Sequence, residues 1–271
     1  FSLYLIYLTV PKVNIIKEFS LMIFLILAIL VWEPVIFYFP IIFLIEVIDN
    51  KILKINFNLF KIFLLFIPGT LLGLYIALNP LTLEEYEIMS SVLINEFGER
   101  CYMSCEFLKT KSSIIEQFAQ YKAYNFERLF RYFLIIMIGF GPIFILLKNL
   151  KLKQKIIFFQ NFENLIYPVL ISLIPVIILF AMGYDWGRWV SITYVFTAIF
   201  YFYLYKKNYI FLNKILEKNI ITNLSKKYFI ILFIIFCFGW NPKTTVTGDV
   251  ASFPGYRIPY KTISFFIRGH L

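Results

Sequence analysis

The sequence predicts an all-α protein, a polytopic transmembrane bundle of about six or seven spans with a folded helical outer loop. The first observation behind this prediction is the composition. Of the 271 residues, 61% are hydrophobic and 15% are charged, and the mean hydropathy is +0.79. A soluble domain has roughly a quarter of its residues charged, so this chain cannot cover itself with polar groups in water. The other two observations are a series of long apolar runs and the distribution of lysine and arginine between them.

The candidate spans are apolar runs that approach the roughly 20 residues a helix needs to cross a bilayer. Because lipid offers no hydrogen-bond partners, each run is expected to be a helix that satisfies its own backbone groups. In chain order the runs are 1–10, 19–48, 59–78, 132–147, 165–182, 189–205 and 228–240. The chain begins with Phe1 inside the first run rather than with Met. We therefore interpret residues 1–271 as one integral-membrane domain of an N-terminally truncated chain.

Segment 19–48 differs from the other runs because Trp32, Glu33 and Pro34 interrupt it. As a continuous helix it would be about 45 Å long, which is too long for one upright crossing and too short for two. Two interpretations remain open: a kinked helix broken at Glu33-Pro34, and a re-entrant pair of half-helices.

Lysine and arginine orient the predicted spans, because cytoplasmic loops carry an excess of both. One group of loops holds thirteen basic and three acidic residues: 49–61, 148–163 and 206–227. The other holds eleven basic and ten acidic residues: 79–131, 183–188 and 241–271. The groups alternate along the chain. We therefore expect the first group, with its first loop bounded as 49–58, on the cytoplasmic side of a bacterial inner membrane. The net charge of +10 then reflects topology, and no nucleic-acid partner is expected.

The largest predicted outer loop, 79–131, carries two helix-start signals. Thr82 and Glu85 have the spacing of a capping box, apolar residues follow at helical spacing as far as Phe97, and Gly98 is a typical C-terminal stop. Residues 113–116 repeat the capping-box pattern. We expect two short amphipathic helices, which form either a packed connector or a lid over an outward-facing site.

Two further segments are predicted to lie at the membrane surface. Loop 206–227 alternates lysine with aliphatic residues, which predicts an interfacial amphipathic helix held by anionic lipid. The tail 241–271 carries aromatic and aliphatic residues that predict a second interfacial segment.

Small residues and prolines predict how the spans pack and bend. Gly69 and Gly73 form a small-xxx-small pair that lets another helix approach closely. Kinks are predicted at three prolines: Pro142, Pro168 and Pro175.

The first candidate site is the Gly-Tyr-Asp-Trp-Gly-Arg-Trp stretch at 183–189, at the outer mouth between two predicted spans. Asp185 and Arg188 are three residues apart, so both can face one way at the start of a helix. Trp186 and Trp189 flank them at headgroup depth. One interpretation is an aspartate helix cap within an aromatic belt. The other is a catalytic acid–base pair, in which arginine binds phosphate and indole rings bind the apolar faces of sugars.

The second candidate is Glu33, an acid within an apolar run. A charge at the bilayer centre costs about 2.5–3.5 kcal/mol on insertion scales, so it must pair, face the bundle interior or take up a proton. Arg188 or Arg131 would be its partner in a structural ion pair; otherwise Glu33 is expected to be functional.

Cysteine and histidine offer little for a metal site. Cys101 and Cys105 are spaced poorly for a disulfide within one helix, Cys237 falls within a predicted span, and the only histidine is His270. No metal is expected. The chain also lacks the phosphate-binding and dinucleotide-binding glycine motifs and the nucleophile-elbow motif, so no cofactor is expected.

The stretch at 183–189, together with the aromatic run from Glu33 through Pro40, resembles segments of uncharacterised bacterial multi-pass proteins of surface-polysaccharide type. Those proteins are similar to O-antigen polymerases and related enzymes of lipid-linked sugars. The resemblance implies glycan assembly on the outer face of an inner membrane, with Asp185 and Arg188 near a polyprenyl-phosphate-linked sugar.

Three functions therefore remain open. The first is a membrane glycan polymerase or glycosyltransferase with Asp185, Arg188 and Glu33 as catalytic residues and Trp186, Trp189 and Arg131 as substrate-binding residues. The second is a transporter or flippase in which Glu33 carries protons. The third is a non-catalytic membrane subunit. Membrane lipid is the expected partner in all three.

Overall fold

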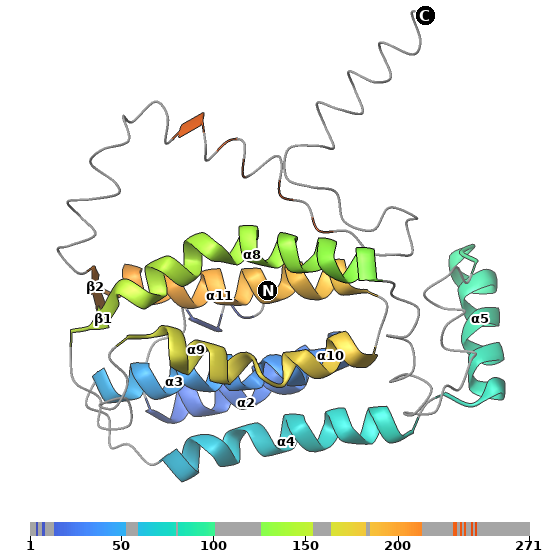
Figure 1. Ribbon diagram of the computed structural model, residues 1–271. Helices are drawn as coiled ribbons and strands as arrows, with labels where there is room; N and C mark the ends of the chain where they lie inside the picture. Colours follow the sequence, from blue (N-terminus) through green and yellow to red (C-terminus); the bar gives the residue numbers. More distant parts are fainter. Residues whose placement is uncertain are drawn as a thin grey trace, which may run out of the picture. The chain divides into compact units, whose positions relative to one another are not determined.

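The computed structural model describes 4, 7–8, 14–52, 59–79, 81–100, 126–153, 164–182, 185–212, 230–231, 234, 236, 240 and 242 (Figure 1). These residues are mostly helical, which confirms the predicted all-α class. They fall into two compact units, and each is described by itself. Unit 1 comprises Phe1–Ile36 and Leu59–Phe118, and unit 2 comprises Phe37–Asn58 and Ala119–Leu271.

Unit 1 is built on the packing of α2 (Asn14–Val31) against α4 (Leu59–Leu78). Gly73 of α4 is buried, and a Cβ there would lie 3.3 Å from Cδ1 of Ile29 and 3.4 Å from Cδ1 of Ile36. The predicted role of this glycine in close helix approach is confirmed. An ion pair also joins the two helices, with 2.7 Å between Lys61 Nζ and Glu18 Oε1.

Helix α5 (Leu83–Phe97) confirms the first helix that the outer loop predicts. The Thr82 backbone N–H donates to Glu85 Oε2 over 2.7 Å, and the Glu85 backbone N–H donates to Thr82 Oγ1 over 3.3 Å. The helix ends at Gly98, whose φ of 66° lies in the left-handed region that glycine adopts without strain. The second predicted helix, with its start at 113–116, lies outside the described residues.

The interrupted segment 19–48 extends from 14 to 52 in the structure. It divides into α2, the 3-10 helix η1 (Glu33–Tyr38) and α3 (Phe39–Ile52). The break after Val31 lies where Glu33 and Pro34 predicted it. The boundary of loop 49–58 was wrong, because Asp49 belongs to α3 and is 1% exposed.

Unit 2 contains α3, α8 (Phe126–Asn149), α9 (Ile166–Leu173), α10 (Val176–Met182) and α11 (Trp186–Lys206). Helix α3 packs against α9 and α11, and α8 lies along α11. Almost every side chain of α3 from Ile41 to Asp49 is buried. A kink was predicted at three prolines. Pro175 lies at the break between α9 and α10, whereas α8 continues through Pro142 and α9 through Pro168.

A short antiparallel ribbon joins the ends of α8 and α11. Strand β1 (Leu150–Leu152) pairs with β2 (Ile210–Leu212), and Leu150 lies opposite Leu212. Helix α11 ends at Lys206, and Asn208, two residues later, has a φ of 55°. There the backbone N–H of Tyr209 donates to the Leu204 carbonyl over 3.0 Å, which is a Schellman-type ending. The prediction of an interfacial helix over 206–227 was therefore wrong as far as residue 212, where the chain forms a turn and a strand. Residues 213–227 lie outside the described residues.

Two described helices are long and apolar enough to cross a membrane, Leu59–Leu78 and Tyr132–Asn149. The segment Ile166–Met182 is apolar but shorter. Helix α11 has 21 residues, but its tyrosine, tryptophan and threonine side chains lower its hydropathy. Length and composition thus support a membrane location, whereas a bundle of six or seven spans stays a prediction. The predicted span 228–240 and tail 241–271 lie almost wholly outside the described residues.

Gly73→Leu is expected to destabilise unit 1. The added side chain must displace Ile29 and Ile36, and overpacking of this kind costs about 1–3 kcal/mol. Gly141→Leu is the matched control, because a Cβ at Gly141 has nothing within 4 Å. Thermal unfolding of the two variants in detergent measures the effect. Equal melting temperatures for both variants would contradict the close packing of α4 on α2.

Candidate functional site

Asp185, the first residue of the predicted site, occupies the N-cap position of α11. Its backbone carbonyl accepts hydrogen bonds from the N–H groups of Arg188 over 2.9 Å and Trp189 over 3.1 Å, which start the helix. Its side chain, however, makes no capping hydrogen bond. The carboxylate turns instead to Arg188, with 2.8 Å between Arg188 Nε and Asp185 Oδ2. The simple helix-cap interpretation therefore does not account for this carboxylate.

The two oxygens of the Asp185 carboxylate differ in their surroundings. Oδ2 is held by Arg188, whereas Oδ1 is buried and has no hydrogen-bond partner among the described residues. The Asp185 side chain is 20% exposed and the Arg188 side chain 61%. Burial raises the pKa of Asp185 above its ordinary value, and the positive charge of Arg188 offsets part of that rise. A partly buried acceptor thus lies beside an exposed guanidinium.

The two tryptophans of the stretch anchor the start of α11. The Trp186 indole N–H donates to the Phe180 carbonyl over 2.7 Å, and its ring lies 5.2 Å from that of Tyr132 on α8. Trp189 is 9% exposed, and its backbone carbonyl accepts the Thr193 hydroxyl over 2.7 Å. Most of the open surface of the site is therefore that of Arg188.

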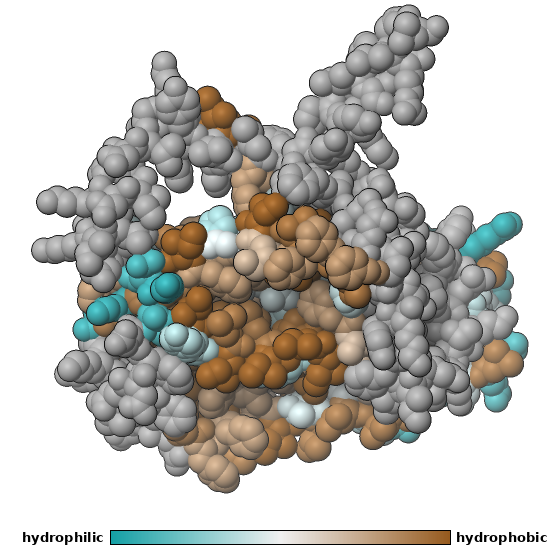
Figure 2. Space-filling view, in the orientation of Figure 1, coloured by the Kyte–Doolittle hydropathy of each residue, from teal (hydrophilic) through white to brown (hydrophobic). Residues whose placement is uncertain are grey.

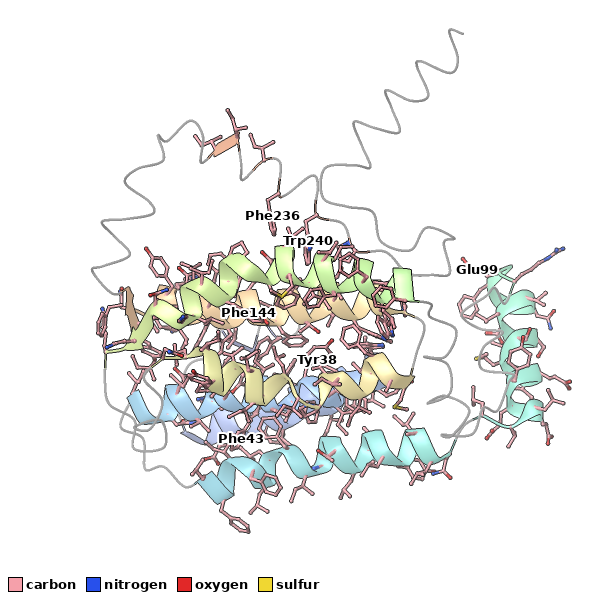
Figure 3. The ribbon with its side chains drawn as sticks, in the orientation of Figure 1. Tyr38, Phe43, Glu99, Phe144, Phe236 and Trp240 are labelled. Atoms are coloured by element: carbon pink, nitrogen blue, oxygen red, sulfur yellow. The ribbon has the colours of Figure 1, made fainter. Side chains whose placement is uncertain are left out.

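A buried pair of hydroxyl groups joins α11 to the residue that precedes α3. Tyr38, at the end of η1 and labelled in Figure 3, lies with its hydroxyl oxygen 3.0 Å from Thr193 Oγ1. Its ring stacks on Phe196 with 4.6 Å between centroids. These contacts fix the first turns of α11, on which Asp185 and Arg188 depend for their geometry.

No described contact joins the other two predicted site residues, Glu33 and Arg131, to Asp185. Glu33 begins η1, belongs to unit 1 and is exposed. Arg131 lies in α8 directly before Tyr132, but its side chain lies outside the described residues. The predicted pairing of Glu33 with Arg188 or Arg131 therefore stays a prediction.

The sequence also contained a polar pair that we did not predict. Glu46 and Asp49 of α3 are 2% and 1% exposed, and the Tyr209 hydroxyl donates to Asp49 Oδ1 over 2.8 Å. The signal was their spacing of three residues within an apolar helix, which places both on one face.

The described residues contain no group of three side chains that could hold a metal ion. Cys101, Cys105, Cys237 and His270 lie outside them. No family model, curated protein or solved structure matches the chain. The function must therefore be argued from the chemistry of these side chains.

Asp185→Asn is expected to stabilise the protein at neutral pH. Because burial raises the folded-state pKa of Asp185, the ionised carboxylate opposes folding above that pKa, and the neutral amide removes the penalty. A rise in melting temperature is therefore expected. The gain should shrink as the pH falls through the raised pKa and vanish below the ordinary value of 3.8, where the carboxyl is protonated in both the folded and the unfolded wild type.

Arg188→Gln provides the matched comparison. It removes the charge that offsets the burial of Asp185, so it should destabilise the wild type at neutral pH and have little effect in the Asp185→Asn background. A melting-temperature difference between Asp185→Asn and wild type that is constant from pH 3 to pH 8, the window about that ordinary value, would contradict the burial of this carboxylate.

Proposed function

We propose that the chain is a multi-pass protein of a bacterial inner membrane, with about six or seven spans, that acts on lipid-linked sugars at the extracytoplasmic face as a glycan polymerase or glycosyltransferase. The observation that carries the proposal is the Asp185–Arg188 pair at the start of α11. One carboxylate oxygen is buried without a hydrogen-bond donor among the described residues, and the neighbouring guanidinium is exposed.

Contacts within unit 2 support the proposed topology. At one end of the paired helices, Trp186 contacts Tyr132. At the other end, β1 pairs with β2, and Tyr209 donates to Asp49. Helices α8 and α11 therefore run parallel, as two helices that both cross from outside to inside must. The loops with excess lysine meet at one end, and Asp185 lies at the other.

The chemistry of the pair fits a phosphate-linked sugar. An exposed guanidinium binds phosphate oxygens through charge-assisted hydrogen bonds, and the partly exposed carboxylate beside it is an acceptor of the kind that binds a sugar hydroxyl. A carboxylate with a raised pKa is a stronger base than an ordinary aspartate. Asp185 would take the proton of the attacking hydroxyl, while Arg188 stabilises the departing phosphate.

The remaining residues have supporting roles in this proposal. Trp186 and Trp189 hold the first turn of α11 through the contacts described above, and Trp186 retains partial exposure for a sugar ring. Arg131 precedes the tyrosine that contacts Trp186, so its backbone lies at the same end of α8.

A second candidate function, a proton-coupled transporter or flippase, is favoured by the break between α2 and α3. Glu33 stands at the start of the 3-10 turn that separates the two helices, and interrupted helices with a polar residue at the break are typical of transporter sites. Substrate-dependent proton uptake by proteoliposomes, abolished by Glu33→Gln, would favour this function over the first.

Asp185→Asn and Arg188→Ala are expected to reduce the production of long-chain surface glycan in the host by about 10²-fold or more, as loss of a general base or a phosphate ligand does. The measurement is the chain-length distribution of extracted glycan at matched protein levels. Glu99→Gln and Arg100→Ala are the matched controls, because they remove an exposed acid and an exposed base just after α5. Unchanged glycan in the Asp185 and Arg188 variants would leave a non-catalytic subunit as the better interpretation.

A further inference from the structure

The β1–β2 ribbon brings two lysine-bearing segments together at one end of unit 2. Five exposed lysines lie at the ends of α8 and α11 and in or beside β1, and we name them the lysine platform: Lys148, Lys151, Lys153, Lys206 and Lys207. Lys151 lies opposite Phe211 across the ribbon, and the Lys153 backbone N–H donates to the Tyr209 carbonyl over 2.9 Å. Figure 2 shows hydrophilic residues gathered where Figure 1 draws β1 and β2.

No acidic residue of the same elements reduces this positive charge. From Phe126 to Leu152 the only acid is Glu127, at the opposite end of α8, and from Trp186 to Leu212 there is none. Asp49 of α3 contacts this end of unit 2 through Tyr209, but its carboxylate is buried and accepts a hydrogen bond from the Tyr209 hydroxyl. Within the described parts of α8, β1, α11 and β2, the surface at this end therefore presents lysines without carboxylates among them.

Aromatic residues occur in the same elements as these lysines, with Phe202 and Tyr205 in the last turns of α11 and Phe211 in β2. Phe202, Tyr205 and Phe211 are exposed. Aromatic residues beside lysine are typical of the membrane–water interface, where rings lie at headgroup depth and ammonium groups reach the phosphates.

The frame beneath these lysines is ordered by specific contacts. Leu150 and Ile210 are buried, and the Schellman-type ending at Asn208 and the hydrogen bond from Tyr209 to Asp49 fix the turn between α11 and β2. Lys207 Nζ lies 5.9 Å from the centroid of the Tyr203 ring. Lysines on a fixed frame lose less conformational entropy on binding than lysines on a mobile tail.

We propose that the lysine platform is a binding site for anionic phospholipid headgroups of the cytoplasmic leaflet. Charge complementarity and the exposed aromatic residues select this occupant. The inference rests on the membrane topology of the proposed function but not on sugar chemistry at Asp185. The glycan assay of the Asp185 variants and the lipid-binding assay of the lysine variants therefore test the two proposals separately.

The test is binding of a fluorescent phosphatidylglycerol to the full chain in zwitterionic detergent, read by anisotropy. The triple variant Lys151→Gln/Lys153→Gln/Lys207→Gln should bind at least about fivefold more weakly, which is the factor that one basic residue contributes near an anionic surface. The corresponding triple arginine variant keeps the charge and should bind as the parent does. Labelled phosphatidylcholine should bind the parent and the variants equally weakly.

Three results would overturn the proposal. The first is a glutamine triple variant that binds phosphatidylglycerol as tightly as the parent. The second is equal binding of phosphatidylcholine and phosphatidylglycerol by the parent. The third is displacement of the labelled lipid by inorganic phosphate as effectively as by unlabelled phosphatidylglycerol, which would identify a free-phosphate site. The single variant Lys151→Gln, compared with Arg100→Gln after α5, decides the question if the triple variant unfolds.

Discussion

The constraint on which this structure depends is that an apolar chain must satisfy inside the protein every polar group that it removes from water. Unit 2 meets it largely with helix carbonyls as acceptors. The hydroxyls of Ser172, Thr193 and Thr197 donate to carbonyls three or four residues earlier in their own helices. Trp240, shown beside α8 in Figure 3, donates to the Ile135 carbonyl over 3.0 Å. Asp185 Oδ1, by contrast, is buried and has no hydrogen-bond partner among the described residues.

The same constraint explains why the two ends of unit 2 differ in composition from its middle. The middle of α8 and α11 holds an aromatic and aliphatic core in which Phe140 meets Tyr194 edge-on. Charged side chains collect beyond it, with Asp185 and Arg188 at one end and the lysine platform at the other. Asp49, buried near the second end, is tolerated because Tyr209 donates to it. The proposed site for a phosphate-linked sugar and the proposed contact with anionic lipid thus lie at opposite ends of the same pair of helices.

Local signals in the sequence were enough to predict local structure. The Thr82–Glu85 capping box, the stop at Gly98 and the break before Glu33 each depend on residues within one or two helical turns, and each is confirmed. The ribbon and the extension of α3 to Ile52 depend on partners far along the chain. The hydrogen bond between Asp49 and Tyr209 spans 160 residues, so no local pattern contains it. The adjacency of Asp185 and Arg188 was predictable from their spacing, whereas the unequal environments of the two carboxylate oxygens required the packing of unit 2.

The proposed topology requires α11 to cross the membrane with Arg188 outside and Lys207 inside. Single cysteines at these two exposed positions, introduced after Cys101, Cys105 and Cys237 are replaced by serine, test it directly with a membrane-impermeant maleimide. The expected result is labelling of Arg188→Cys in intact spheroplasts and labelling of Lys207→Cys only after lysis. Labelling of both cysteines from the same side of the membrane would contradict this topology.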